Sequence, residues 1–364
     1  MKKFLFLAAL AMFALTSFSQ EKETTGFQIS NLALEVRADF DYLNRKIDTS
    51  SYSTSGFSGK FLNFKIAGNI TDRFFYAYRQ RLNLKGLDTA SDFFSKTDYM
   101  YLGWQATECF ALSAGKQVVA MGGIEYDLAP IDVYFHTEFW NTVACYQFGV
   151  NAIFKTRDKK NTFTAQFVNS PFGGEGLSGL YSYNAHWRAD YKHFGPVCSV
   201  NFYEYSKGKF LNVIALGTAF SFGPVYGYLD YTNRASFEQK NFFFDDMTID
   251  GRVGVYFLKD KMSVYVKGGY DVNKAQEEKV LESNDLNEVY DHFILPGTEI
   301  TFYGGGVEFF PLKGRQDIRL NAFFAINDTR CLTSFSNGVF CFNRDELTYQ
   351  ANVSLTWRIN FIKR

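Results

Sequence analysis

The chain has 364 residues, and its 38 lysines and arginines balance 38 aspartates and glutamates, so the formal net charge is zero. This balance excludes the large basic surface that nucleic-acid binding requires, and we expect no nucleic-acid partner. Aromatic residues make up 19% of the chain and prolines number only 6. That amount of aromatic surface is hard to bury in one soluble core, but it suits a lipid-facing belt.

The N-terminus has the pattern of an export signal. Lys2 and Lys3 precede an apolar stretch at residues 4–15, which is followed by small residues and an abrupt polar turn. Such a segment is a secretory signal peptide and is too short to be a spanning helix. We therefore expect residues 1–19 to be removed and residues 20–364 to form one mature domain, without a lipid anchor because no cysteine lies at the cut.

The cysteines do not indicate a disulfide framework or a metal site. Five are present, an odd number, and they are spread over the chain. Cys331 and Cys341 fall in one predicted outer loop and could pair in an oxidising compartment. A metal site would need closer spacing and histidine partners, so we expect neither metal nor cofactor.

A period of two recurs along the chain. In the strand at 180–193, "LYSYNAHWRADYKH", aromatic and small residues alternate with polar ones. This pattern gives one apolar and one polar face, and it fits either a soluble sandwich or a membrane barrel. Segments with the same alternation are found at 34–42, 62–70, 74–84, 248–257, 262–271, 317–327 and 347–361.

The length of the strands favours lipid over a soluble core. The last segment, "LTYQANVSLTWRINF", keeps seven apolar positions on one face. Soluble strands average about five or six residues, whereas a tilted transmembrane strand needs about 9 to 11. We therefore predict an all-β fold, a transmembrane antiparallel up-and-down barrel in an outer membrane.

The connections alternate between short turns and long loops, as they do in outer-membrane barrels. With one short outer connection at 206–210, they predict sixteen strands and place both termini on the side of the turns. The short turns are expected at 71–73, 106–108, 156–161, 194–196, 223–224, 259–261 and 311–316. The longer loops are expected at 44–57, 85–97, 120–140, 170–180, 235–245, 273–297 and 329–346.

A barrel of this size is too wide for side chains to fill, so a water-filled channel is expected. The loop at 120–140 carries glycines, a proline and apolar residues, which makes it too hydrophobic for a solvated loop. We expect it to fold inward and narrow the channel, although an external loop packed on its neighbours is the alternative.

Basic residues on inward positions are the candidate determinants of selectivity. Arg37, Lys65, Arg79 and Arg81 fall on the first three strands and should form one basic wall that attracts anions. In the alternative, carboxylates neutralise this wall in a lattice that only stiffens it. Further inward basic positions are Arg188, Arg252 and Lys267.

Catalysis is not expected. His186 and Asp190 share a strand face four residues apart, about 13 Å along the strand, which is too far for an orienting hydrogen bond. No serine lies in a G-x-S-x-G turn. "GGGVEFF" at 304–310 continues a strand pattern and lacks the helix that a nucleotide loop requires.

The stretches "FYAYRQRLN" and "LGWQATECFALSAGKQVVAMGGIEYDLAPIDVYFHTEFWN" resemble the phosphate-selective porin O and P family. The resemblance implies a sixteen-stranded, trimeric porin whose third loop folds into the lumen and which passes anions such as phosphate. It carries over Arg79, Arg81 and Lys116 as lumen residues, although the alternation places Lys116 on the lipid side unless a bulge resets the phase. The loop departs from the family pattern, since it has no lysine and carries Glu125, Asp127, Asp132 and Glu138.

Three functions are compatible with the sequence. The leading hypothesis is a passive diffusion channel for small hydrophilic anions, embedded in outer-membrane lipid and weakly selective. The second is a surface binding or adhesion protein that acts through its outer loops, including 273–297. The third is a soluble exported sandwich with lectin-like binding.

Overall fold

The computed structural model describes residues 25–47, 49–82, 94–173, 178–235, 241–274, 293–295, 297–312, 315–336 and 339–363, without the side chains of residue 25 and of 331–344. The expected signal peptide, residues 1–19, lies outside the described residues. The suggested pairing of Cys331 with Cys341 also falls on side chains outside them.

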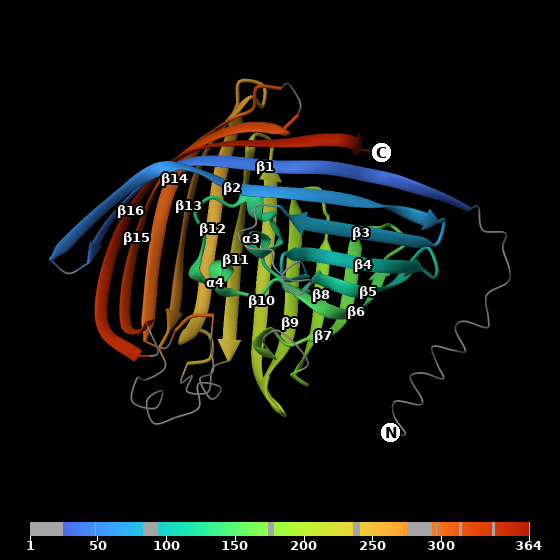
Figure 1. Ribbon diagram of the computed structural model, residues 1–364, viewed down its shortest axis with the longest axis horizontal. Helices are drawn as coiled ribbons and strands as arrows, with labels where there is room; N and C mark the ends of the chain where they lie inside the picture. Colours follow the sequence, from blue (N-terminus) through green and yellow to red (C-terminus); the bar gives the residue numbers. More distant parts are fainter. Residues whose placement is uncertain are drawn as a thin grey trace.

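Sixteen strands form a closed antiparallel barrel, so the predicted fold class and strand number are confirmed (Figure 1). Each strand pairs with its neighbours in the chain, and β1 pairs with β16 to close the ring. In the described part of the chain no helix is long and apolar enough to cross a membrane. The strands are β1 (Thr25–Ile47), β2 (Ser50–Thr71), β3 (Phe74–Arg81), β4 (Thr97–Gln105), β5 (Phe110–Val118), β6 (Tyr146–Lys155), β7 (Asn161–Asn169), β8 (Tyr181–Ala189), β9 (Phe194–Ser206), β10 (Lys209–Phe222), β11 (Val225–Ala235), β12 (Asp246–Phe257), β13 (Met262–Asn273), β14 (Thr298–Phe309), β15 (Ile318–Ser336) and β16 (Val339–Lys363).

Burial in this barrel is the reverse of that in a soluble protein. On β16, Val353 is 54% exposed while its neighbour Ser354 is 1% exposed. On β13, Val266 is likewise exposed, whereas Lys267 is buried. Because successive side chains point to opposite faces, the apolar residues lie outside and the polar residues inside. This arrangement answers the question that alternation alone left open, since the apolar face meets lipid.

Several glycines in the wall lie directly opposite an aromatic residue whose ring covers them. Gly254 on β12 pairs with Tyr226 on β11, and a side chain added at Gly254 would come within 2.5 Å of the Tyr226 ring. Gly269 on β13 has the same relation to Phe302 on β14. These glycines leave room for large inward rings where two strands are in register, which explains the glycine-rich sequence of β12–β14.

Two expected long loops are strands instead. β1 extends to Ile47 and β2 begins at Ser50, within the loop expected at 44–57. β15 extends to Ser336 and β16 begins at Val339, within the loop expected at 329–346. The outer part of β2 is exposed on both faces, so no hydrophobic alternation marks it. The turn expected at 194–196 lies at 190–193, between β8 and β9.

Placing a side chain under an aromatic ring should destabilise the barrel. We expect Gly254→Val to lower the free energy of unfolding by about 1–3 kcal/mol, because the new side chain overlaps the Tyr226 ring. The measurement is the urea midpoint of the folded, heat-modifiable band on gels. The control is Gly56→Val on β2, where no atom lies within 4 Å of the added carbon; equal midpoints for the two variants would contradict the explanation.

Candidate functional site

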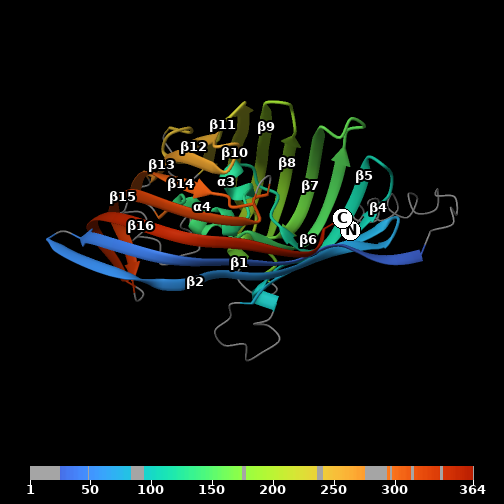
Figure 2. The same cartoon turned by 90° about the horizontal axis from the view of Figure 1, so that it is seen from above.

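The connection between β5 and β6, residues 119–145, runs inside the barrel, and we call it the inner loop. It contains α3 (Ile124–Asp127), the 3-10 turn η1 (Pro130–Asp132) and α4 (Glu138–Thr142). Both views place α3 and α4 within the ring of strands (Figure 2). The inner loop includes the whole 120–140 segment that the sequence assigned to the channel interior.

Local sequence explains how the inner loop turns. Gly123 precedes α3 with φ of 98°, a conformation that side chains other than glycine rarely adopt. Thr137 begins α4, and its hydroxyl accepts a hydrogen bond from the Trp140 amide at 3.0 Å. This is the capping role that threonine performs at helix starts.

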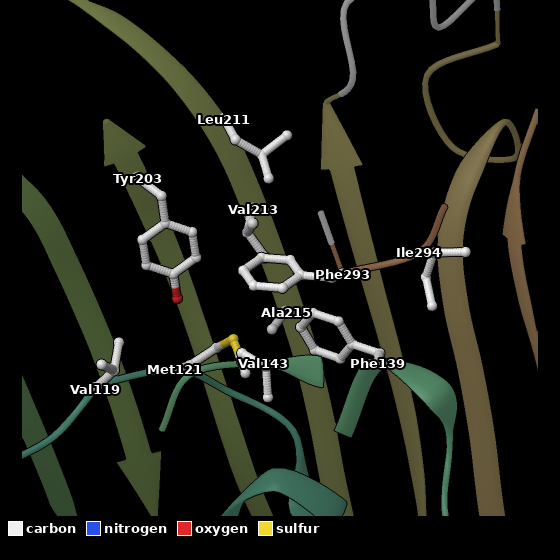
Figure 3. Packing of buried hydrophobic residues seen from close by; sticks show 10 residues of the cluster. All are labelled: Val119, Met121, Phe139, Val143, Tyr203, Leu211, Val213, Ala215, Phe293 and Ile294. Atoms are coloured by element: carbon white, nitrogen blue, oxygen red, sulfur yellow. The ribbon is translucent and has the colours of Figure 1, made fainter. Parts of the chain in front are cut away.

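An apolar cluster inside the lumen fixes the inner loop against β9 and β10 (Figure 3). The cluster consists of buried side chains next to β9 and β10, so it fills that part of the interior with packed side chains. The buried members are Val119, Met121, Phe139, Val143, Tyr203, Leu211, Val213, Ala215, Phe293 and Ile294.

The end of the loop before β14 joins the same cluster. Phe293 packs edge-on against Phe139 with ring centroids 5.4 Å apart, and its carbonyl accepts a hydrogen bond from Thr142 at 2.7 Å. The Ile294 carbonyl accepts one from Asn273 at 2.9 Å. Most of the predicted outer loop 273–297 lies outside the described residues, but residues 293–295 reach into the lumen.

Two aspartates of the wall hold the starts of the inner helices. The Asp230 carboxylate on β11 accepts hydrogen bonds from the amides of Ile124 at 2.8 Å and Glu125 at 2.7 Å. Asp271 on β13 accepts one from the Glu138 amide at 2.9 Å. Each bond pairs a helix N-terminal amide with a negative charge, the favourable sign for a helix start.

Asp132 is the ion-pair anchor of the inner loop. Its two carboxylate oxygens lie 2.6 Å from Arg319 on β15 and 2.5 Å from Arg358 on β16. Burial opposes ionisation of Asp132, but the two guanidinium groups outweigh it and keep the pKa of Asp132 below its ordinary value of 3.8.

Arg37 on β1 holds the middle of the inner loop. It forms an ion pair with Asp39 at 2.7 Å, donates a hydrogen bond to the Val133 carbonyl at 2.6 Å and lies 4.4 Å from the centre of the Tyr134 ring. Its side chain is 2% exposed. Arg37 therefore contacts the inner loop and is not exposed to solvent in the lumen.

The other acidic residues of the inner loop differ in their partners. Glu125 forms an ion pair with Lys267 on β13, which also donates to the Phe135 carbonyl at 2.6 Å. Asp127 forms an ion pair with Arg188 on β8, and both side chains are well exposed. Glu138 accepts a hydrogen bond from Asn141 at 3.5 Å, and burial raises its pKa.

A second group of charges lies on β1–β4, and we call it the wall cluster: Glu35, Lys65, Arg79, Arg81 and Asp98. Glu35 lies 3.4 Å from Lys65 and 3.5 Å from Arg79. Asp98 lies 2.7 Å from Arg81 and 3.3 Å from Arg79. Within the wall cluster three cations therefore share two carboxylates, and Glu35 also lies 3.6 Å from Arg358 outside it. This is a lattice of the kind that is the alternative to a free basic wall.

Lys116 does not line the lumen. The register pairs it with Met100 on β4 and Phe148 on β6, both exposed on the outer face. Its ammonium donates to the Phe94 carbonyl at 2.8 Å. The bulge that would have turned Lys116 inward is absent from the ladders of β5 with β4 and β6, so the placement carried over from the resemblance is wrong for this residue.

The contacts of Arg252 on β12 are with side chains of other strands of the wall. It lies 2.8 Å from Glu308 on β14, and its guanidinium carbon is 3.8 Å from the centre of the Tyr265 ring. Of the predicted basic residues that face inward, only Lys65, Arg81 and Arg188 keep much of their side chains exposed.

The sequence missed the residues that hold the inner loop. Asp230, Asp271, Arg319 and Arg358 all occupy inward strand positions, so alternation indicated their face. No signal in the sequence indicated that they contact the inner loop, because their partners lie 105 or more residues away along the chain.

The described side chains include no group of three histidines, cysteines, aspartates or glutamates arranged to hold a metal ion. Two described histidines pack against aromatic rings, His136 at a tilt and His193 stacked. His136 lies 4.6 Å from Trp140 and His193 lies 5.1 Å from Phe222, measured between ring centroids.

Removing the Asp132 charge should loosen the inner loop. We expect Asp132→Asn to leave Arg319 and Arg358 without their shared carboxylate, to cost about 2 kcal/mol of stability and to increase current noise in planar bilayers. The control is Asp317→Asn, which removes a carboxylate paired with Arg315 at 2.7 Å on an exposed turn. Noise equal to wild type in Asp132→Asn would contradict the anchoring role.

The same anchor predicts a pH dependence. A carboxyl whose folded pKa is depressed contributes stability above its unfolded pKa and loses it as the pH falls through the folded pKa. Because the pKa of Asp132 lies below 3.8, the anchor should hold from neutral pH down to pH 3.8 and weaken only in stronger acid. Single-channel recordings across this range check the expectation.

Comparison with known proteins agrees with this architecture. None of the curated protein sequences matches the chain significantly. The barrel is similar to the outer membrane channel DcaP of Acinetobacter baumannii, with 12% identity, a TM-score of 0.58, and coverage of 90% of this chain and 97% of that one. It is also similar to OmpT, an outer membrane protein of Vibrio cholerae, with 13% identity, a TM-score of 0.50, and coverage of 93% and 99%.

These structures show a shared fold, and the sequence itself shows the family. The model of the family described as phosphate-selective porin O and P matches residues 31–259, which is more than half of the chain. Together with the closed barrel and its apolar outer face, this match shows that the chain belongs to the phosphate-selective porin O and P family and is a porin of the outer membrane.

Proposed function

We propose that the protein is a passive diffusion channel for small hydrophilic solutes with a weak preference for anions, phosphate among them. Residues 1–19 direct its export, and residues 20–364 form the channel in the lipid of a Gram-negative outer membrane. As in the family that it resembles, the assembled form is a homotrimer. The inner loop is the constriction in this proposal.

The observation that carries the proposal is the exposure of the charges in the wall cluster. The side chains of Lys65 and Arg81 are 27% and 46% exposed, whereas those of Glu35 and Asp98 are 4% and 3% exposed. A solute in the lumen therefore meets cations first, with the carboxylates behind them. Such a surface raises the local concentration of anions.

The position of the inner loop supports a path along the same wall. Its ion pairs and hydrogen bonds with Asp230, Lys267, Arg319 and Arg358 reach β11, β13, β15 and β16, and Arg37 holds it to β1. The apolar cluster fills the side next to β9 and β10. We place the solute path between the inner loop and the exposed side chains of Lys65 on β2 and Arg81 on β3.

The small net charge of the wall cluster is consistent with weak selectivity. The cluster carries three cations and two carboxylates, a net charge of one. In water a unit charge changes the energy of an ion about 7 Å away by about 0.6 kcal/mol, which is close to RT. Salt screens this further, so a preference of a few-fold is expected and not a strict filter.

The test is the reversal potential of the refolded protein in a planar bilayer under a KCl gradient. A steady conductance with a reversal potential on the anion side is expected, and Arg79→Ala plus Arg81→Ala should move it toward zero, because the cluster loses two cations. Inhibition of the chloride current by added phosphate would identify phosphate as a permeant or bound anion.

The matched control removes two arginines from short turns, Arg157→Ala plus Arg315→Ala, and should leave the reversal potential unchanged. Absence of conductance from folded protein would overturn the channel function and leave the outer loops as the functional part. Conductance without a shift in the double variant would overturn the anion path along β1–β4.

A further inference from the structure

Two buried carboxylates, Glu35 and Asp98, stand among the cations that face the proposed path. Glu35 comes from β1 and Asp98 from β4, on either side of Arg79 on β3. Asp98 lies 2.7 Å from Arg81 and 3.3 Å from Arg79, and Glu35 lies 3.5 Å from Arg79. The two carboxylates and the arginine between them form a continuous chain of charges across the wall.

The contacts within this chain join the same buried charges to one another. Arg79 Nε lies 3.3 Å from Asp98 Oδ2, and a terminal nitrogen of Arg79 lies 3.5 Å from Glu35 Oε2. Both separations are longer than an ordinary charge-assisted hydrogen bond of about 2.7–2.9 Å, so these groups meet mainly as ion pairs. The chain therefore places two carboxylates directly beside the cations that face the proposed path.

The size of the cluster decides what a passing ion senses. Its ion-pair distances are 2.7–3.5 Å, which is shorter than the screening length of about 8 Å at physiological salt. An ion beside Lys65 or Arg81 therefore also senses the buried carboxylates paired with them. Each carboxylate lowers the positive potential that this ion meets.

We propose that Glu35 and Asp98 are specificity-determining residues that hold the anion preference of this channel at a low level by offsetting Lys65, Arg79 and Arg81. This inference rests on the proposed path along the wall cluster. It assigns selectivity to acidic residues, whereas the basic residues alone were the candidates from the sequence.

Of the two carboxylates, Asp98 is the better position for a test, because its ion pairs do not involve the anchor of the inner loop. Glu35 also lies 3.6 Å from Arg358, which anchors the inner loop through Asp132. The ion pairs of Asp98 are with Arg79 and Arg81 only, among the described residues. A change at Asp98 therefore alters the charge of the wall cluster without touching the anchor.

The experiment compares reversal potentials under a KCl gradient for a series that changes the cluster charge in single steps. We expect Asp98→Asn and Glu35→Gln each to raise the chloride-to-potassium permeability ratio by about twofold or more, and Arg81→Gln to lower it by a similar factor. The paired variant Asp98→Asn plus Arg81→Gln restores the wild-type cluster charge and should restore the wild-type ratio.

The control is Glu308→Gln, which removes an equally buried, ion-paired carboxylate from β14, close to Arg252 and Arg319. It should leave the ratio unchanged, and a rise as large as that of Asp98→Asn would overturn the assignment. Folding of every variant is checked by heat-modifiability, and if a single variant does not refold, Glu35→Gln and the paired variant provide the result.

The outcomes separate this inference from the function on which it rests. If Arg79→Ala plus Arg81→Ala leaves the reversal potential unchanged, the path itself is wrong. If that variant shifts the potential while Asp98→Asn and Glu35→Gln do not, the path stands and the role of the carboxylates is overturned.

Discussion

Closure of the backbone ladder is the constraint on which the rest of this structure depends. β1 pairs with β16 from Asn31 to Ile47, so the ring has no open end. In hydrocarbon an unpaired backbone group costs several kcal/mol, and a closed ring satisfies all of them between strands. Closure also commits every strand to one face in lipid and one face in the lumen, which is why Val353 is exposed and Ser354 is buried.

Charge pairing is stronger where the charged side chains are buried, and many ion pairs at the inner loop are of this kind. Asp132 bridges Arg319 and Arg358, while Asp230 and Asp271 accept the amides at the starts of the inner helices. The apolar cluster around Phe139 and Phe293 adds packed side chains against β9 and β10. The two kinds of contact hold the inner loop from several strands of the ring.

The basic residues differ in exposure because some of them contact the inner loop and others do not. Arg37 and Lys267 are buried against the inner loop and hold it through hydrogen bonds and ion pairs. Lys65 and Arg81 remain partly exposed in the wall cluster. A count of inward arginines and lysines therefore overstates the charge that a solute meets. In the function proposed above, selectivity depends on the cations that keep exposed side chains although they are ion-paired, Lys65 and Arg81.

The sequence by itself determined the barrel, because alternation of apolar and polar residues over long strands and the spacing of short turns are local features. It also placed Arg37, Lys65, Arg79 and Arg81 on inward positions. It did not reveal that β2 continues through Ser50–Lys60, where both faces are exposed and no alternation exists. The alternation placed Lys116 on the outer face unless a bulge intervened, and only the register with Met100 and Phe148 showed that no bulge does. The partners of Asp132, and of Arg79 between Glu35 and Asp98, were decided by the tertiary structure alone, because ion pairing depends on distances between strands that closure brings together and that no local pattern encodes.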